Sequence, residues 1–251
     1  MSSQHVVIVG GSSGIGFAAA RKLLGRGFKV TITGRDPKRL EAARKKLSGD
    51  IAAVAMDAAD AAGLPEAFGR IGKLDHLVLA LGSGRGVGPF ASVALADVKA
   101  GFEEKVFAHF ATAQAALPHL RRDGSLTFIA AVSAHGAMPG TAGIGAANAA
   151  VVGLVKILAA ELRPLRVNAI SPGVVDTPWW DFLSADQKAP VFADLAAQTP
   201  VARVGRPDDI AQAIAFLVAD GFMSGETIVC DGGLRWTTGQ SLEVSRSGAE
   251  A

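Results

Sequence analysis

The feature that most constrains the fold of this chain is a glycine-rich turn between an apolar strand and a helical stretch near its start. Residues 5–9 read His-Val-Val-Ile-Val, residues 10–16 read Gly-Gly-Ser-Ser-Gly-Ile-Gly, and residues 17–24 have a helical pattern. Such a turn needs glycine because it is tight and because phosphates approach its backbone closely. The helix then offers them free N–H groups. The order strand, turn, helix predicts dinucleotide binding, with a purely structural turn as the alternative.

Short β-branched runs alternate with alanine-rich helical stretches along the whole chain, which is the pattern of parallel βαβ units. Strands are predicted at residues 5–9, 30–33, 52–55, 76–81, 125–130, 166–170 and 226–229. We see no linker, repeat or low-complexity stretch that would divide the chain. We therefore expect one α/β domain over residues 1–251, a single-domain Rossmann fold whose doubly wound, seven-stranded parallel sheet carries helices on both faces.

Two segments fall outside this alternation. Residues 176–204 make a long connection that contains Trp179, Trp180 and Phe182, and connections of this length are usually lids or binding loops. We expect a substrate lid there, whose aromatic rings favour an apolar or aromatic small molecule. Residues 236–251 turn polar, and we expect the last ten to be mobile or to lie on a partner subunit.

Composition excludes several classes of protein. A hydrophobic content of 49% with 19% charged residues indicates a packed soluble domain, and a net charge of +2 gives no nucleic-acid footprint. Gly, Ser or charge interrupts each apolar run, so we expect no membrane helix. The start lacks the basic region of a signal peptide, and the single cysteine, Cys230, makes no internal disulfide. We therefore expect a cytoplasmic protein, and we expect no metal site.

The glycine turn resembles that of the short-chain dehydrogenase/reductase family. The family's turn reads Thr-Gly-x-x-x-Gly-x-Gly, and its three glycines correspond to Gly10, Gly14 and Gly16, with Val9 in place of the Thr. The resemblance extends over residues 5–235 and is strongest at the two ends. It implies hydride transfer at a nicotinamide cofactor and assembly into a homodimer or homotetramer.

The resemblance also assigns cofactor contacts farther along the chain. Asp57 matches the family's aspartate at the adenine ring, and Gly82 survives from a strand end that reads Asn-Asn-Ala-Gly in the family. Residues 166–178 match the segment whose Pro-Gly turn passes beside the nicotinamide. The expected cofactor-binding residues are Gly10, Ser12, Ser13, Gly14, Ile15, Gly16, Arg35, Asp57, Gly82, Pro172, Gly173, Val175 and Thr177.

The end of the second strand favours NADP(H). An acidic residue there would bind the ribose hydroxyls of NAD, but the strand ends at Gly34 and is followed by Arg35. In the family, a guanidinium at this place pairs with the 2′-phosphate of NADP, and such a charge-assisted pair discriminates strongly. Asp36 has nearly the spacing of a ribose ligand, yet it precedes Pro37 and a helical pattern. We interpret it as a helix N-cap.

The family's four catalytic residues are an Asn, a Ser, a Tyr and a Lys. Their positions fall on Lys105, Ala131, Ile144 and Asn148, and the chain contains no tyrosine. Alanine and isoleucine have no exchangeable proton and asparagine does not titrate, so the family's proton relay has no counterpart at these positions. The resemblance therefore implies an atypical member that lacks the Asn-Ser-Tyr-Lys set.

Three polar residues near these positions are candidates for the missing proton transfer. Lys105 adds an amine whose pKa would fall in a dry site. Ser133 and His135 follow the fifth strand, where they would orient and protonate a substrate. The alternative is that Lys105 extends to solvent and that the other two make local hydrogen bonds in a loop.

Three functions remain open. We expect an atypical NADP(H)-dependent oxidoreductase that reduces an activated or apolar carbonyl compound, because such compounds need less help from an acid. The first alternative is a non-catalytic NADP-binding or sensor protein. The second is an isomerase or dehydratase that uses the same fold without net redox change.

Overall fold

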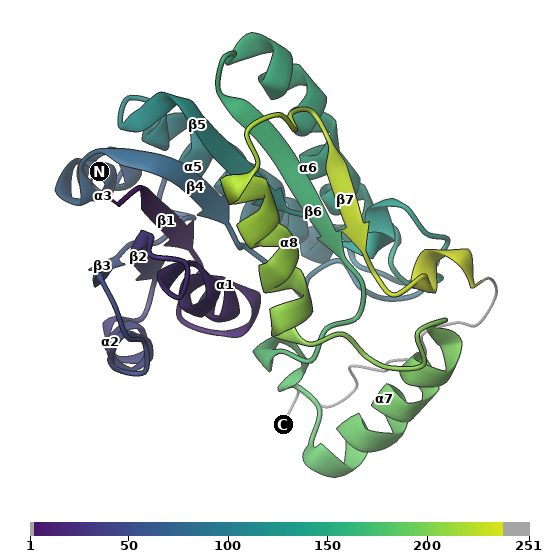
Figure 1. Cartoon of the computed structure of the whole chain (residues 1–251). Helices are drawn as coiled ribbons and strands as arrows, with labels where there is room; N and C mark the ends of the chain where they lie inside the picture. The colour runs from purple at the N-terminus through teal and green to yellow at the C-terminus, as the bar shows by residue number, and fades with distance from the viewer. Residues whose placement is uncertain (1–2, 238–251) are drawn as a thin grey trace.

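The sheet is doubly wound, and all seven of its strands are parallel, as expected (Figure 1). It is seen in a computed structural model of the chain, which describes residues 3–237. The spatial order is β3-β2-β1-β4-β5-β6-β7. The strands are β1 (His5–Val9), β2 (Lys29–Gly34), β3 (Ile51–Ala55), β4 (Leu74–Leu79), β5 (Leu120–Ile129), β6 (Arg166–Pro172) and β7 (Thr227–Cys230). Each predicted strand is present, and the predictions differ only in where strands begin and end.

Helices cover both faces of the sheet, with α1 and α8 on one and α5 and α6 on the other (Figure 1). The α-helices are α1 (Gly14–Leu24), α2 (Pro37–Lys45), α3 (Leu64–Ile71), α4 (Leu95–Phe102), α5 (Ala108–Ala116), α6 (Ala142–Glu161), α7 (Ala185–Gln198) and α8 (Pro207–Ala219). The shorter helices are η1 (Glu103–Phe107), η2 (Val132–Ala134), η3 (Pro178–Trp180) and η4 (Leu234–Trp236). Of these, η1 is a single π-helical turn between α4 and α5.

Strand β1 shows why the sequences of the strands are continuously apolar instead of alternating between apolar and polar residues. Val6 and Ile8 belong to the core under α1 and α8, whereas Val7 and Val9 belong to the core under α3, α5 and α6. Successive side chains of a strand point to opposite faces, so a sheet covered on both sides buries every residue. All four valine and isoleucine side chains are at most 2% exposed. The strand therefore holds its carboxyl end rigidly where the glycine turn begins.

Strand order reverses between β1 and β4, and this positions the site. Connections from β1 lead toward β2 and β3, whereas connections from β4 lead toward β5 and β6. The segments that follow the two strands diverge, which leaves a crevice at the carboxyl ends of the strands. Ligands of open α/β sheets bind at such switch points.

The segment expected as a lid loop is largely helical. Residues 176–204 contain η3 and the helix α7, which a reciprocal capping box starts. Ser184 Oγ accepts the Gln187 backbone N–H at 3.4 Å, and Gln187 Oε1 accepts the Ser184 N–H at 3.0 Å. A segment without the alternating pattern of a strand can be either a loop or a capped helix, so this pattern alone did not reveal α7. Of the expected tail, residues 238–251 lie outside the described residues.

Helix α6 corrects the expectation that no segment has the length and apolar character of a membrane helix. An 18-residue window of this 20-residue helix has a mean hydropathy of 1.7, enough to cross a membrane by length and composition alone. The expectation rested on uninterrupted apolar runs. A mean hydropathy stays high even when glycines and one lysine interrupt the run, as they do in this helix. Val151 and Val155 are fully buried in the core with β5 and β6. Buried residues make up 28% of that window, and a single helix of this kind is weak evidence for a membrane span.

Candidate active site

A cavity of about 630 Å³ lies at the carboxyl ends of β1, β4, β5 and β6. The structure brings most of the sequence-predicted site residues into its wall. Those that line it are Gly10, Ser13, Gly14, Ile15, Gly16, Arg35, Gly82, Lys105, Ala131, Ser133, Ile144, Asn148, Pro172, Gly173, Val175 and Thr177. The described wall does not include Ser12, Asp57 or His135. The candidate cofactor and catalytic segments therefore share one continuous space.

The glycine turn after β1 leaves little room for side chains. A Cβ on Gly16 would collide with the carbonyl oxygen of Gly10. Gly14 has a φ of +52°, and a Cβ there would lie 3.3 Å from Thr177 Cβ. Residue 16 must be glycine for the helix to pack against the strand, and Gly14 lets the segment after β6 close on the turn.

Helix α1 begins beside the cavity at Gly14. Its N-cap residue, Ser13, makes no side-chain capping hydrogen bond within the described chain, and no acidic residue lies in the first turn. The first N–H groups of a helix have no partner inside it and carry the positive end of its dipole. This end of α1 therefore suits the phosphates of a dinucleotide.

Two exposed guanidinium groups, Arg35 and Arg39, lie at the same end of the cavity, after β2. Asp36 between them is a helix cap, because its Oδ1 accepts the backbone N–H groups of Lys38 and Arg39 at 2.8 and 3.2 Å. The sequence-based interpretation of Asp36 is thus confirmed. With this carboxylate engaged in capping α2, the exposed charge beside the cavity is positive, as a 2′-phosphate requires.

Asp57 makes a local turn after β3. Its Oδ1 accepts the Ala59 N–H at 3.0 Å. A carboxylate in such a turn retains further lone pairs, so its role at an adenine ring stays a prediction.

The segment after β6 forms the opposite wall. Thr177 Oγ1 accepts the backbone N–H of Trp179 at 3.4 Å, and Val175 pairs with Gly205 in an isolated parallel bridge. A Cβ on Gly173 would meet Asp231. These contacts hold the segment in the wall of the cavity, and its contact with a nicotinamide stays a prediction.

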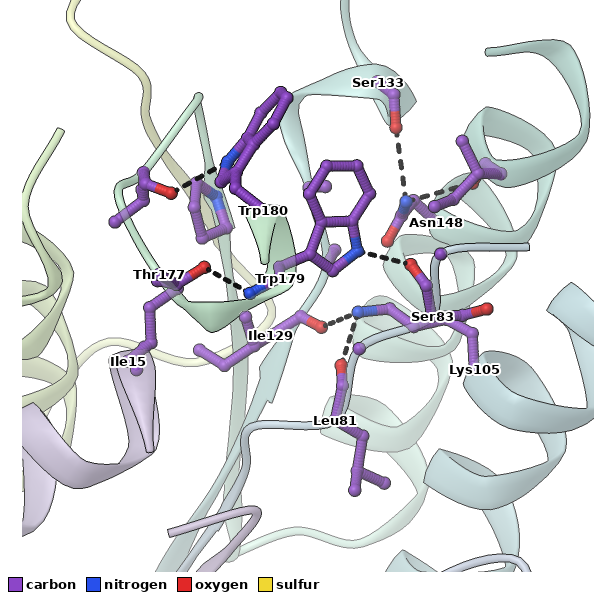
Figure 2. A pocket seen from close by; sticks show the side chains of 18 of the residues that line it. Ile15, Leu81, Ser83, Lys105, Ile129, Ser133, Asn148, Thr177, Trp179 and Trp180 are labelled. Atoms are coloured by element: carbon purple, nitrogen blue, oxygen red, sulfur yellow. Dashed lines mark hydrogen bonds between the residues drawn. The ribbon is translucent and has the colours of Figure 1, made fainter. Parts of the chain in front are cut away.

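Lys105 projects from the π-helical turn η1 toward the ends of two strands. Its Nζ donates hydrogen bonds to the carbonyl oxygens of Leu81 and Ile129, each at 2.7 Å (Figure 2). The residue is 4% exposed, so the alternative in which it extends to solvent is wrong. Burial lowers the pKa of the ammonium to about 7. Lys105 is therefore a titratable group in the wall of the cavity at neutral pH.

Ser133 and Asn148 form a polar pair on the same wall. Asn148 Nδ2 donates to Ser133 Oγ at 3.2 Å and to the Ile144 carbonyl oxygen at 3.0 Å (Figure 2). Asn148 is 1% exposed, and its Oδ1 has no hydrogen-bond partner among the described residues. A buried acceptor of this kind needs a donor. Sequence reasoning set Asn148 aside because it does not titrate, and so missed its hydrogen-bonding capacity.

His135 lies behind the wall rather than in it. Its Nε2 is 2.9 Å from the hydroxyl of Ser171, which is fully buried. Burial and, to a smaller degree, the nearby charge of Arg235 lower the pKa of the imidazole. The partner is 36 residues away in the sequence, so this is not a local loop hydrogen bond, and the role of His135 toward a substrate stays a prediction.

Aromatic side chains close the cavity from the segment after β6. Trp179 Nε1 donates to the Ser83 carbonyl oxygen at 3.0 Å, which ties this segment to the loop after β4 (Figure 2). Trp180 Nε1 donates to the Val175 carbonyl oxygen at 3.2 Å, and its ring lies 5.5 Å from that of Phe192. Trp179, Trp180 and Phe182 line the cavity. The predicted apolar ceiling is therefore present.

Polar residues of the wall that were not identified from the sequence include Ser83 and Glu104. Ser83 Oγ donates to Glu104 Oε2 at 2.8 Å, and both residues line the cavity. The only sequence signal was their position, one residue after Gly82 and one before Lys105. Residue type alone gave no reason to place them at a site.

The chemistry of the wall fits a dinucleotide. The glycine turn leaves the backbone accessible to phosphates, and the start of α1 supplies N–H donors. Asn148 Oδ1 is a buried acceptor without a partner among the described residues, and the hydroxyls of a ribose are donors that would satisfy it. Each of these groups lies in the wall of one cavity.

Known proteins resemble almost the whole chain. Residues 9–235 match the family model described as Enoyl-(Acyl carrier protein) reductase. A Bacillus subtilis protein named as a probable 2,4-dienoyl-CoA reductase is 33% identical over 249 residues, which cover 93% of this chain and 97% of the relative.

Solved structures share the fold over a similar length. An oxidoreductase of the short-chain dehydrogenase/reductase family from Burkholderia thailandensis has a TM-score of 0.85 and 30% identity, with 93% of each chain covered. A small-chain dehydrogenase in complex with NADPH has a TM-score of 0.80 and 28% identity, covering 93% of this chain and 99% of that one. The similarity thus includes both walls of the cavity.

Proposed function

The chain belongs to the short-chain dehydrogenase/reductase family of oxidoreductases, and from that membership we propose that it reduces an activated or apolar carbonyl compound with NADPH. The observation that carries the proposal is the one continuous cavity. It joins the glycine turn and Arg35 at one end to Lys105 and the aromatic ceiling at the other. A cofactor and a small apolar substrate would then meet in one space.

NADP(H) is the cofactor that the charges support. Arg35 and Arg39 lie at the end of the cavity next to β2, and Asp36 is engaged in capping α2. A guanidinium forms strong, often bidentate hydrogen bonds with a phosphate. The related small-chain dehydrogenase that was solved with NADPH adds support.

Lys105 and Ser133 are the proton-bearing side chains that we assign to the substrate oxygen. When bound, the cofactor supplies the hydride that converts the carbonyl group to an alcohol. The Lys105 ammonium has three N–H donors and uses two of them on backbone carbonyls. The third is left for a substrate oxygen, and the hydroxyl of Ser133 is a second donor. Trp179, Trp180 and Phe182 place apolar surface beside this step.

The proposed substrate class follows from the absence of a proton-donating side chain at two positions of the cavity wall. The family's tyrosine and serine positions are Ile144 and Ala131, and neither side chain has an exchangeable proton. A carbonyl group that is activated by conjugation needs less assistance from an acid. Trp179, Trp180 and Phe182 favour apolar or aromatic ligands.

The absence of an exchangeable proton at Ile144 and Ala131 also favours a second candidate function, a protein that binds NADP(H) without transferring hydride. Ile144 and Ala131 would then mark a site in which the proton relay is no longer needed. This candidate predicts tight NADPH binding and no oxidation with any carbonyl compound.

The test is NADPH oxidation by the purified protein over a panel of diketones, quinones and conjugated ketones. We expect turnover with at least one conjugated carbonyl compound. Lys105→Met should lower that activity by roughly a hundredfold or more, the usual contribution of a general acid. Lys156→Met, at an exposed lysine of α6, is the matched control. NADPH binding without turnover over the whole panel would support the second candidate instead.

A further inference from the structure

We propose that the amine of Lys105 forms a covalent imine with α,β-unsaturated aldehydes or ketones that enter the cavity. The ligand class rests on the proposed function, since both require a carbonyl compound in this space. The imine itself forms without a cofactor, so the two proposals can be tested separately. Three observations carry the inference: the direction left free at the nitrogen, the missing carboxylate partner and the apolar wall.

The hydrogen bonds of Lys105 determine which direction at its nitrogen is free. Nζ donates to Leu81 and Ile129, each at 2.7 Å (Figure 2). A neutral amine has two N–H donors and one lone pair, so these two bonds use both donors. The lone pair then points away from the two carbonyl groups. Because Lys105 lines the cavity, a ligand can approach the amine there.

Within residues 3–237, no ion pair joins Lys105 to a carboxylate. The neighbouring Glu104 is hydrogen-bonded to Ser83 at 2.8 Å. His109, one turn along, contacts the carbonyl oxygens of Lys105 and Leu79, and burial, then the charge of Lys105, lowers its pKa to about 3. Burial also lowers the pKa of Lys105 to about 7. Free amine is therefore abundant near neutral pH, as in other lysines that form Schiff bases.

The surroundings of the amine favour loss of water. Leu81, Ile129 and Ile144 line the cavity with apolar atoms, and an imine is protected from hydrolysis where water is excluded. Ser133 Oγ accepts a hydrogen bond from Asn148 at 3.2 Å. The hydroxyl hydrogen of Ser133 remains a donor for the oxygen that leaves.

The covalent step joins Nζ of Lys105 to the carbonyl carbon of the ligand and releases one water molecule. The Nζ lone pair attacks the carbonyl carbon, and the π electrons of the C=O bond move to oxygen. A proton moves from nitrogen to oxygen to give a carbinolamine. Protonation of its hydroxyl group and loss of water leave a conjugated iminium ion on Lys105.

The covalent form offers a route to reduction that differs from the direct reduction of the carbonyl group to an alcohol, because Lys105 is then bonded to the carbonyl carbon instead of donating a proton to the oxygen. A bound NADPH would supply a hydride to the β carbon of the iminium ion, which would give an enamine on Lys105 and NADP⁺. Protonation at the α carbon and addition of water then release the saturated carbonyl compound and the free amine. Hydride at the imine carbon would instead leave a stable secondary amine on Lys105.

The test is reductive trapping of the full chain without cofactor. Benzylideneacetone, an aromatic conjugated ketone, is incubated with the protein at pH 7.4, and sodium cyanoborohydride reduces any imine to a stable amine. Intact mass and peptide mapping then locate the adduct. At this pH the fraction of free amine on Lys105 is roughly 700 to 900 times that of an exposed lysine. We therefore expect one adduct per chain, on Lys105.

Variants and a second readout separate the possible failures. Lys105→Met should lose the adduct and Lys156→Met should keep it. The mapped position in the unaltered protein is informative even if Lys105→Met does not fold. Labelling of Lys105 no greater than that of exposed lysines would overturn the inference. If NADPH is oxidised with conjugated ketones and no adduct forms, the proposed function survives alone. An adduct on Lys105 without NADPH oxidation would support the imine and contradict the proposed NADPH-dependent reduction.

Discussion

Lys105 departs from ordinary lysine behaviour because the chain around it removes water and supplies only neutral partners. It extends from a π-helical turn, a rare element that is frequent at functional sites. Two backbone carbonyls accept its hydrogen bonds, and it is 4% exposed. The partial charges of carbonyl oxygens do not replace the hydration of an ammonium, so burial favours the neutral amine.

The buried amine predicts a dependence of stability on pH. Between about pH 7, the folded-state pKa, and the ordinary value of 10.5, the unfolded chain binds a proton on Lys105 that the folded chain has released. Raising the pH through this window therefore stabilises the fold, by about 1.4 kcal/mol per pH unit. Urea unfolding of the unaltered protein and of Lys105→Met over this range measures it. The difference in unfolding free energy should grow with pH, and a constant difference would contradict a buried titrating lysine.

Arg35 and Asp36 are neighbours with opposite expected roles. Arg35→Ala should weaken NADPH binding by roughly tenfold to a hundredfold, because a hydrogen bond to a charged group contributes about 1.5–3 kcal/mol. Binding of NADH should change little. Dissociation constants from fluorescence titration measure both effects.

The control is Asp36→Ala. It removes the cap of α2, and it should lower the unfolding free energy by about 1 kcal/mol. The ratio of NADPH to NADH affinity should stay unchanged. A shift of that ratio toward NADPH would mean that Asp36 faces the ribose after all.

At the scale of elements, the unit that builds the site is β1, its glycine turn and α1. β1 is buried on both faces, so its end is fixed, and the turn places the start of α1 against the cavity. The close approach of Gly16 to Gly10 holds this arrangement. An element that binds phosphate through its backbone depends on the exact path of that backbone.

Gly16→Ala should therefore weaken NADPH binding by at least tenfold and destabilise the protein, because the new Cβ would collide with the Gly10 carbonyl oxygen. Gly153→Ala in α6 is the matched control. A Cβ there meets no atom within 4 Å, so helix stability should rise by about 0.5–1 kcal/mol with unchanged binding. Thermal melts and NADPH titration of the two variants make the comparison. Equal affinities would contradict the role of the turn.

Elements with a strong local signal were predictable from the sequence. The strands have runs of β-branched residues, the turn has spaced glycines, and Asp36 precedes a proline at a helix start, so each was located. The π-helical turn at Lys105 and helix α7 were not, because neither has a hydrophobic period that sets it apart. Lys105 was placed near the site, but its burial follows from α4–η1–α5 packing on strands far away in the sequence. The burial of Asn148 Oδ1 without a hydrogen-bond partner among the described residues also follows from packing between distant segments, so the sequence did not reveal it.

At the scale of the whole molecule, the sheet converts distant segments into one cavity. The switch between β1 and β4 opens the crevice, and the segments after β5 and β6 complete its walls. One end of the cavity carries glycine backbone, a helix start and guanidinium groups. The other carries a buried amine under aromatic rings. This division predicts a dinucleotide along the length of the cavity and a small apolar ligand at the amine.

The most direct test of cofactor binding in the cavity is a titration of the purified protein with NADPH and with NADH, monitored by tryptophan fluorescence. Trp179 and Trp180 line the cavity, so a bound nicotinamide should change their emission. We predict saturable binding with NADPH favoured over NADH by roughly tenfold or more, the difference that a guanidinium–phosphate pair supplies. Absence of saturable binding by either nucleotide would show that the cavity is not a cofactor site.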